Sequence, residues 1–451
     1  MFDNKLFLKN LTRVVLPIAF QLFMLSLVSA SDALMLGMLS QDALSAVSLA
    51  SQVTFVENLF LAALTIGLST LAAQFWGKKQ PDMIETVFAY TLKVTSIIAL
   101  IFFLLALIAP SLLMRFFTND QSLILQGASY LRVVSPSFLL TGISQIYLCI
   151  LKNTDRALKA SLISSACVII NIALNAVFIF GLLGIPAMAI AGAALATDIA
   201  RIIELICCLN ETGKKSPVRL KMEYIFKEQT DISKDFWKYT GPVLGNEIVW
   251  GMGFTMYSVI MGHLGTDAVA ANSIANIVKN LVVCFCTGLG SGGGILVGNE
   301  LGAGHLDLAK EYGKKLCHLS IICGLISGFV MFCLTPAVLY VTSLSQTSQH
   351  YLQWMFFFCA IYMVGKSING TTIAGIFCAG GDTRFGFICD TITMWCITVP
   401  LGLISAFILK WPVLVTYLII NMDEIVKLPA VYRHYKKYLW VKDLTNKQME
   451  D

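Results

Sequence analysis

Residues 17–37 of the chain read PIAFQLFMLSLVSASDALMLG, and residues 242–262 read PVLGNEIVWGMGFTMYSVIMG. These stretches open a repeat, because residues 17–77 align without a gap with residues 242–302, 225 positions later, with 14 identities in 61 positions. The acids break the repeat: Asp32 aligns with Tyr257, and Glu247 aligns with Leu22. A gapless match of this length indicates duplicated structure. Two halves of one fold are therefore predicted, each with its own buried acid.

The composition is that of a membrane protein. Of the 451 residues, 57% are hydrophobic and 13% are charged, whereas soluble domains carry about 25% charged residues. Apolar runs of roughly 20 residues recur, and each is long enough to cross a hydrocarbon core about 30 Å thick. The backbone in lipid must satisfy its own hydrogen bonds, and runs without strand-like alternation predict helices rather than a barrel. The chain is therefore predicted to be an all-α polytopic membrane protein.

The apolar runs and the turn signals between them predict twelve spans, at 14–36, 44–74, 86–114, 126–151, 159–182, 185–209, 237–263, 268–298, 312–342, 350–378, 385–409 and 412–433. Lys and Arg gather in alternate loops, while the opposite loops hold little beyond Arg115 and Lys410. By the positive-inside rule both termini are expected in the cytoplasm. An even number of spans agrees with that expectation, and the cell membrane is the expected location.

A polar segment at 210–236 separates the two sets of six spans. It predicts an N-terminal lobe at 1–209, a C-terminal lobe at 237–435 and a charged cytoplasmic tail at 436–451. Because each half starts and ends on the same side, the repeats are parallel, as in transporters whose halves rock about a site near the midplane. The glycine run Gly288–Gly294 follows no strand, so it is predicted to pack a helix closely rather than to bind a nucleotide.

The sequence favours no enzyme. It has 13 cysteines without the spacing of a four-ligand metal site, five histidines, no HExxH motif and no Walker A sequence. No cofactor is expected. The formal charge of +5 is spread over loops rather than one face, so nucleic acid is not an expected partner.

The order, spacing and duplication of the motifs resemble the multidrug and toxic compound extrusion (MATE) transporters over nearly the whole chain. The matching residues are Pro17, Asp32, Gly37, Ala43, Gln74–Gly77, Asn171, Asn175, Glu247, Asn299–Gly302 and Ala379–Arg384. The resemblance implies two six-helix bundles, related by a pseudo-twofold axis, in a V shape. It also implies a monomeric antiporter that admits H⁺ or Na⁺ and expels organic, mostly cationic and amphipathic compounds by rocker-switch alternating access.

Asp32 lies in the first predicted span. An ionised carboxylate in hydrocarbon costs roughly 2.5–3.5 kcal/mol on insertion scales, so it normally faces a cavity or a partner. Such a group can exchange a proton, a sodium ion or a cationic substrate; the alternative is a structural hydrogen bond to a neighbouring helix. In the family the acid at this position is central to coupling. The resemblance groups it with Asn171 and Asn175 and places a Na⁺ candidate site at Asp32 and Asn175.

Glu247 is the corresponding acid of the second half, where sodium-coupled family members add an acid on the tenth helix. This chain has Lys366 and Asn369 in that part of the tenth helix. Lys366 is expected either to neutralise Glu247, to compete with substrate as a built-in cation, or to extend toward the interface. Lys366 and Asn369, with Tyr257 and Asp390, are candidates for lining a cavity. Asp390 has an alternative role, which is to form an ion pair with Arg384. Because the tenth helix lacks the acid found in sodium-coupled members, the sequence does not decide whether H⁺ or Na⁺ is the coupling ion.

Asp198, Arg201 and Glu204 share a helix face by their spacing and are expected to form an internally neutralised cluster. Glu57 and Lys93 receive no role. A second class of function is a flippase for a lipid-linked precursor, which requires a strongly cationic cavity. The intramembrane groups are mostly acids and amides, so the sequence favours the antiporter.

Overall fold

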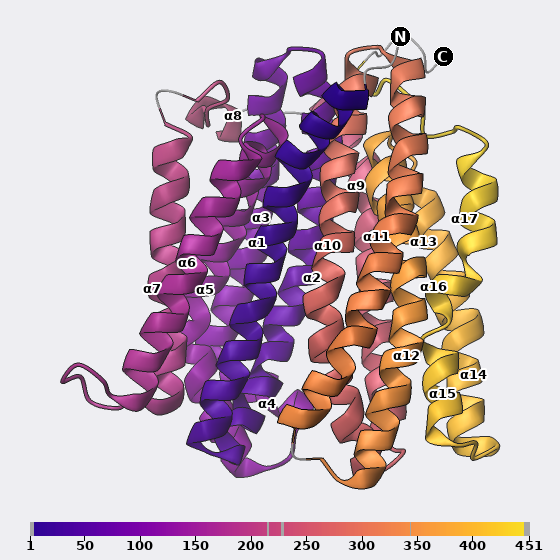
Figure 1. Cartoon of the computed structure of the whole chain (residues 1–451). Helices are drawn as coiled ribbons and strands as arrows, with labels where there is room; N and C mark the ends of the chain where they lie inside the picture. The colour runs from indigo at the N-terminus through magenta and orange to yellow at the C-terminus, as the bar shows by residue number, and fades with distance from the viewer. Residues whose placement is uncertain (1–3, 214–215, 227–229, 343, 446–451) are drawn as a thin grey trace. The chain divides into compact units, whose positions relative to one another are not determined.

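The computed structural model describes residues 4–213, 216–226, 230–342 and 344–445, and within these ranges every regular element is helical. The first half contains α1 (Asn4–Leu39), α2 (Gln41–Gly77), α3 (Pro81–Ile108), α4 (Pro110–Phe117), α5 (Gln121–Asn153), α6 (Ala157–Phe180), α7 (Ala189–Glu211) and α8 (Met222–Phe226). The prediction of an all-α polytopic protein is confirmed. In Figure 1 the helices α5, α6 and α7 lie side by side.

The second half begins with α9 (Thr230–Gly262), α10 (Thr266–Gly302), α11 (Leu306–Val341) and α12 (Gln346–Asn369). It continues through shorter segments, three of them π-helical: η1 (Gly370–Phe377), α13 (Arg384–Asp390), η2 (Thr391–Thr398), α14 (Val399–Leu403), η3 (Ile404–Ile408), α15 (Val413–Ile420), α16 (Asp423–Val426) and α17 (Leu428–Tyr435). In the described residues these helices make twelve passes, each overlapping one predicted span.

The ends of the helices follow from local chemistry. Pro81 and Pro110 occupy the first turn of α3 and α4, where their missing N–H is not needed. Asp120 caps α5 by accepting hydrogen bonds from the backbone of the first turn. Gly181 ends α6 with φ of +74°, a left-handed conformation that glycine adopts without strain. This glycine is the turn signal between the fifth and sixth predicted spans, although α7 begins only at Ala189.

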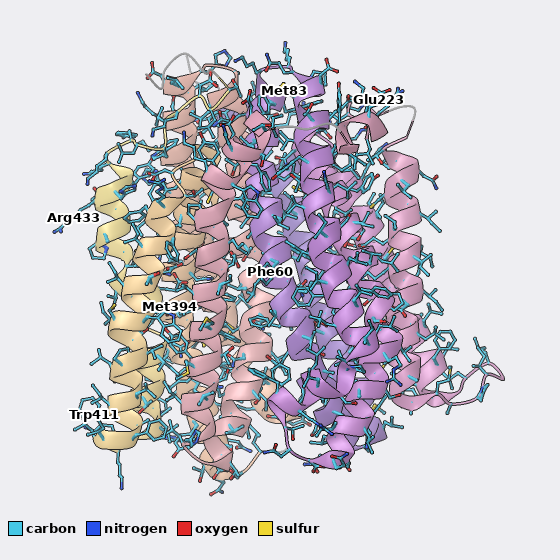
Figure 2. The ribbon with its side chains drawn as sticks, turned by 180° about the vertical axis from the view of Figure 1, so that it is seen from behind. Phe60, Met83, Glu223, Met394, Trp411 and Arg433 are labelled. Atoms are coloured by element: carbon cyan, nitrogen blue, oxygen red, sulfur yellow. The ribbon has the colours of Figure 1, made fainter. Side chains whose placement is uncertain are left out.

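Two predicted spans are interrupted in the structure. The span at 86–114 is divided at Ala109, because Pro110 cannot donate a backbone hydrogen bond and starts the separate helix α4. The span at 412–433 is divided into α15, α16 and α17. Trp411, which precedes the first of these helices, and Arg433 in the last lie at opposite ends of this broken pass (Figure 2). Eight helical stretches of the described chain, one of them the combined segments from Arg384 to Ile408, are long and apolar enough to cross a membrane.

The described residues group into two compact units. Unit 1 consists of residues 1–23, 73–79 and 237–451, and unit 2 consists of residues 24–72 and 80–236. The first half of α1 and the last turns of α2 therefore pack with the second half of the chain. The predicted lobes are continuous segments that end at 209 and begin at 237. The two units are instead defined by which residues contact one another, so each of them combines separate segments of the chain.

Unit 1 is built around the glycine run of α10. A Cβ on Gly288 would lie 2.5 Å from the Cβ of Ala19 in α1, and one on Gly290 would lie 2.8 Å from the carbonyl oxygen of Gly370. A Cβ on Gly293 would lie 2.8 Å from the side chain of Leu316 in α11. The run thus lets three neighbours approach α10 closely, which confirms the packing interpretation of these glycines.

The segment at 436–445, which we call the C-terminal strap, is part of the folded core of unit 1. Trp440 is fully buried, and Cβ atoms added to Gly313 or Gly380 would collide with it. The side-chain amide of Gln74, near the end of α2, donates to the carbonyl oxygens of Ala379 (2.7 Å) and Lys442 (3.1 Å). Residues 436–445 of the predicted charged tail therefore also pack into unit 1 through the buried Trp440, and residues 446–451 lie outside the described residues.

The polar segment predicted as a linker is anchored to α3 in unit 2. The backbone N–H of Arg219 donates to Glu85 at 3.0 Å, and Lys221 pairs with Glu85 and Asp82. Hydrogen bonds to Glu85 and Asp82 raise the pKa of Lys221, because they stabilise its protonated form. Residues 214, 215 and 227–229 of the predicted linker lie outside the described residues.

Candidate functional site

The first candidate site lies in unit 2, where α1, α6 and α7 bring four oxygen-bearing side chains together. The side-chain amide of Asn175 donates to Asp32 Oδ1 at 2.5 Å and to Asn171 Oδ1 at 3.2 Å. Asn171 in turn donates to Thr197 Oγ1 on α7 at 3.4 Å. Asn171 and Asn175 are four residues apart on α6, so both side chains point from the same face. The structure thus brings together Asp32, Asn171 and Asn175, the group expected from the sequence.

This group has an unfilled acceptor. Asn175 is fully buried, and no described residue donates to its side-chain oxygen Oδ1. Buried polar atoms without a partner are costly and uncommon. A carboxylate and neutral oxygens are also the ligand types that hard cations prefer. The chemistry of the group therefore suits a small cation at Asp32 and Asn175.

Further acids and one arginine extend this site along α2 and α7. Arg201 Nη1 pairs with Glu204 at 2.7 Å, and Ser144 donates to the same carboxylate oxygen at 3.0 Å. Asp198 is buried but forms no ion pair in the described part of unit 2. The expected three-residue neutral cluster is therefore reduced to one pair, because Arg201 turns to Glu204 rather than to Asp198. Arg201 also lies within electrostatic range of Asp32 and Glu57.

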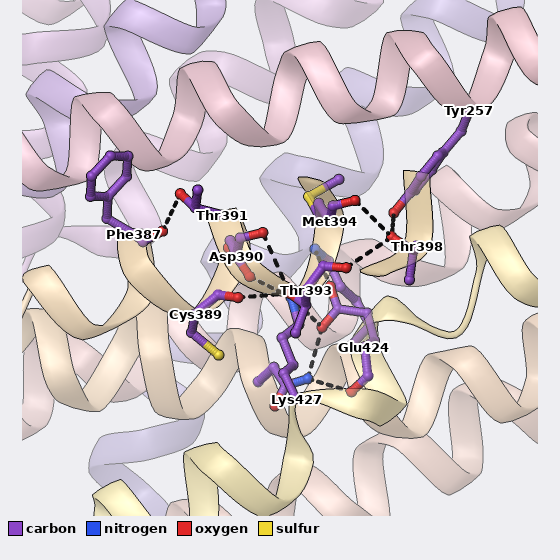
Figure 3. A network of polar contacts seen from close by, with 12 residues as sticks. Tyr257, Phe387, Cys389, Asp390, Thr391, Thr393, Met394, Thr398, Glu424 and Lys427 are labelled. Atoms are coloured by element: carbon purple, nitrogen blue, oxygen red, sulfur yellow. Dashed lines mark hydrogen bonds and ion pairs between the residues drawn. The ribbon is translucent and has the colours of Figure 1, made fainter. Parts of the chain in front are cut away.

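The second candidate site lies in unit 1, where residues of α12, α13 and α16, together with Lys427 just after α16, form a ladder of ion pairs (Figure 3). Lys427 Nζ lies 2.7 Å from Asp390 Oδ1 and 3.1 Å from Glu424 Oε2. Glu424 Oε1 lies 3.1 Å from Lys366 Nζ, and its Oε2 accepts from Asn369 at 2.8 Å. These side chains are buried or nearly so, and Lys366 is the most exposed at 24%.

Two sequence expectations about this ladder are corrected. Lys366 pairs with Glu424 instead of neutralising Glu247, because α16 brings Glu424 against α12. Asp390 pairs with Lys427 instead of Arg384. Lys366 also lies over the ring of Trp250, with 5.4 Å from Nζ to the ring centroid, so a cation–π contact holds it beside the helix that carries Glu247.

Several candidate cavity residues are internal members of this network. Asn369 is 2% exposed and Asp390 is 6% exposed. The hydroxyl of Tyr257 shares a hydrogen bond of 2.6 Å with Thr398 (Figure 3). Glu247 is partly buried and lies within electrostatic range of Lys366 and Asp390. The structure thus brings Glu247, Lys366, Asn369 and Asp390 into one neighbourhood.

Sequence reasoning missed two residues of the ladder, Glu424 and Lys427, and the buried acid Asp423 next to Glu424. Asp423 is buried, and no described residue bonds to its Oδ1. The signal was present: Glu424 and Lys427 are opposite charges three residues apart inside a predicted span. Such a pair in an apolar run indicates an internal partner rather than a simple lipid-facing helix.

Known proteins resemble this chain along nearly its whole length. The family model MatE matches residues 17–177 and 242–404, and these segments begin at the two starts of the internal repeat. The uncharacterized transporter YisQ of Bacillus subtilis is 21% identical over 94% of this chain and 93% of its own length. A probable multidrug resistance protein NorM of Listeria innocua is 25% identical over 72% of each chain.

Solved structures of the same fold are also found. A MOP superfamily transporter from Pyrococcus furiosus aligns with a TM-score of 0.87 at 17% identity, over 96% of this chain and 95% of its own. An outward-facing MATE family transporter aligns with the same TM-score and identity, over 97% of this chain and 96% of its own. At this level of identity the likeness shows the fold.

Proposed function

Because this chain belongs to the MatE family of membrane transporters, we propose that it is a secondary active efflux antiporter. It exchanges inward-moving H⁺ or Na⁺ for outward-moving organic, mostly cationic and amphipathic compounds. The name of one relative, a probable multidrug resistance protein NorM, supports the export of drugs. The protein acts as a monomer in the cell membrane, with both termini in the cytoplasm. The described ends of the chain lie at the same end of unit 1 (Figure 1), which fits that orientation.

One observation carries the proposal. Asp32 is bonded to Asn175, whose own side-chain oxygen is buried and has no partner among the described residues. A cation bound there neutralises the carboxylate and fills the empty acceptor. A cationic substrate competes for the same charge. Because the two ligands share one carboxylate, binding of the cation favours release of the substrate, and the reverse.

The two states of the rocker switch then differ in which side of the membrane can reach Asp32. A cation that enters from outside displaces the substrate outward, and its departure into the cytoplasm restores the ionised carboxylate. The amides of Asn171 and Asn175 position the carboxylate through both steps, because they neither gain nor lose charge. The free energy of the ion gradient thus drives export without ATP.

Replacement of Asp32 by Asn is expected to abolish gradient-driven transport, because an amide neither binds a proton at neutral pH nor carries charge. The measurement is efflux of ethidium from proteoliposomes under a pH gradient alone or a sodium gradient alone. Wild type is expected to respond to one gradient, which names the coupling ion. Asp307→Asn, an exposed acid on α11, serves as the matched control and should transport normally.

If neither gradient drives efflux, or if Asp32→Asn matches wild type, the antiport mechanism is wrong. Flipping of a lipid-linked precursor then becomes the leading function. That alternative needs a cationic cavity for pyrophosphate. In the described part of unit 2, however, Arg201 pairs with Glu204 and lies within electrostatic range of Asp32 and Glu57, so acids outnumber the cation around Arg201.

A further inference from the structure

Lys279 of α10 is a buried lysine that belongs to neither candidate site. It is 8% exposed, and among the described residues it forms no hydrogen bond and no ion pair. Its Nζ lies 5.1 Å from the ring centroid of Tyr362 on α12. A charged side chain inside a membrane protein normally pairs with an opposite charge or faces a ligand or water. A ring face offsets part of the cost of burying an ammonium group, but it leaves the N–H donors of Lys279 without an acceptor.

The internal repeat shows that the duplicated fold does not need this lysine. At the offset of 225 positions, Lys279 aligns with Thr54 of the first half. The same alignment places Asp32 opposite Tyr257. Each half therefore carries a charged side chain where the other half has a neutral one. The first half has a carboxylate, and the second half has an ammonium group.

Four intramembrane acids of unit 1 are engaged with the lysines of the ladder instead. They are Glu247, Asp390, Asp423 and Glu424. Two of these acids bond to Lys366 or Lys427, and the other two lie within electrostatic range of Lys366. Among the described residues, none of the four forms an ion pair with Lys279. The ammonium group of Lys279 is thus available to a ligand.

Polar side chains next to Lys279 could bind the same ligand. Asn272, Asn276 and Lys279 follow one another at intervals of four and three residues, so they share one face of α10. Both asparagines are partly buried, and neither side chain forms a hydrogen bond with a described residue. The same holds for the hydroxyl of Tyr362. Amide and hydroxyl groups can donate to a carboxylate, which offers about four acceptor positions.

Aromatic rings surround this polar group. Tyr257 of α9 lies within electrostatic range of Tyr362. Phe358 is four residues before Tyr362 on α12, and both Phe358 and Tyr257 pack against the hydrophobic core that α10 and α12 share. Ligand sites typically combine apolar and aromatic walls with a few well-placed polar groups. These surroundings favour an organic anion with an aromatic body over a small inorganic anion.

We propose that Lys279 and Tyr362, with Asn276 beside them, form an anion subsite in unit 1 that binds the carboxylate of an amphipathic aromatic compound. The carboxylate accepts hydrogen bonds from Lys279 Nζ and the Tyr362 hydroxyl, and the aromatic body lies against the neighbouring rings. The inference rests on the proposed efflux function. It adds aromatic carboxylates to the cationic compounds that the carboxylate of Asp32 attracts.

Binding of three dansyl compounds to the full-length protein tests the subsite without any ion gradient. Dansylglycine carries a carboxylate, dansylamide is neutral and dansylcadaverine is cationic, while the fluorophore is the same. Fluorescence anisotropy is measured in phosphatidylcholine nanodiscs, with empty nanodiscs as the baseline. Wild type is expected to bind dansylglycine about 10–100-fold more tightly than dansylamide, because hydrogen bonds to charged groups are the stronger class.

Three variants assign that preference to the subsite. Lys279→Met should remove the preference for dansylglycine over dansylamide, whereas Lys279→Arg keeps the charge and should retain most of it. Tyr362→Phe keeps the ring and should weaken dansylglycine by about 2–10-fold, the usual effect of one hydrogen bond. Lys310→Met, on the exposed part of α11, is the matched control and should behave as wild type.

The proposal is overturned if wild type binds dansylglycine and dansylamide equally, or if Lys279→Met keeps the wild-type preference. A wild type that prefers dansylcadaverine to dansylglycine at this concentration range, with Lys279→Met unchanged, would likewise assign the interior of unit 1 to cations. The comparison of the three compounds on wild type requires no variant, so poor folding of Lys279→Met would not leave the subsite untested.

Transport separates this proposal from the function on which it rests. If dansylglycine is preferred as expected but neither gradient drives ethidium efflux from wild type, the anion subsite stands and antiport is wrong. If ethidium efflux is gradient-driven but dansylglycine is not preferred, antiport stands and the subsite is wrong. Gradient-driven export of dansylglycine should be lost in Lys279→Met, and equal export by this variant and wild type would contradict the subsite.

Discussion

Replacement of Gly77 or Gly302 by alanine is expected to destabilise the protein strongly, although it adds only one methyl group. A Cβ on Gly77 would lie 1.9 Å from the carbonyl oxygen of Asn299, and one on Gly302 would lie 1.9 Å from that of Gln74. Both obstacles are backbone atoms, so no rotamer change relieves the clash. Overpacking typically costs about 1–3 kcal/mol, and these sites should reach or exceed the upper end.

The measurement is the thermal midpoint of unfolding in detergent, followed by size-exclusion chromatography of heated samples. Gly370→Ala is the matched control, because its backbone is helical and no heavy atom lies within 4 Å of the added Cβ. The control should melt at or slightly above the wild-type temperature, since alanine favours a helix over glycine. Equal midpoints for Gly77→Ala and wild type would contradict the close crossing of these two helix ends.

Replacement of Lys427 by Met is expected to cost about 3–5 kcal/mol, because it removes the cation from a buried ion-pair ladder. Lys427 is 3% exposed and bonds to Asp390 and Glu424. Glu424 would keep Lys366 and Asn369, whereas Asp390 would lose its ion-pair partner. The loss should appear as a large fall in the thermal midpoint and in the yield of monodisperse protein.

Two further variants sharpen the test. Lys310→Met breaks an exposed pair with Asp307 and should change stability by only about 0–1 kcal/mol. The double variant Lys427→Met/Asp390→Asn removes both charges and should recover most of the loss, because the cost comes from an uncompensated acid. If Lys427→Met is no worse than Lys310→Met, the ladder contributes nothing to folding.

Much of the fold could be predicted from the sequence because its determinants are local. The length of an apolar run can be read directly from the sequence and decides whether that run can cross a membrane. Each of the twelve predicted spans overlaps a helical pass. The departures from regular α-helix in the tenth and eleventh passes could not be predicted in this way. They are π-helical segments such as η2, where Thr398 Oγ1 donates to the carbonyl oxygen of Thr393.

The candidate site was predictable only where family resemblance supplied the partners. The resemblance groups Asp32, Asn171 and Asn175, and the structure joins them. The partners of Lys366 and Asp390 were not found, because an ion pair depends on which helices become neighbours. The internal repeat could not identify these ion-pair partners either, because its gapless match ends at Gly302 and all residues of the ladder follow that position. Buried charge predicts that a partner exists, but not its identity.

The C-terminal strap has a consequence for how the chain is made. Unit 1 combines residues 1–23 with residues 237–451, and the side chain of Trp440 fills its core near Gly313 and Gly380. The first half of α1 must therefore wait for the synthesis of Trp440, more than 400 residues later in the chain, before its unit is complete. Unit 2, which ends at residue 236, can finish much earlier. Biosynthesis should thus pass through an intermediate with unit 2 folded and the first half of α1 still without its final neighbours.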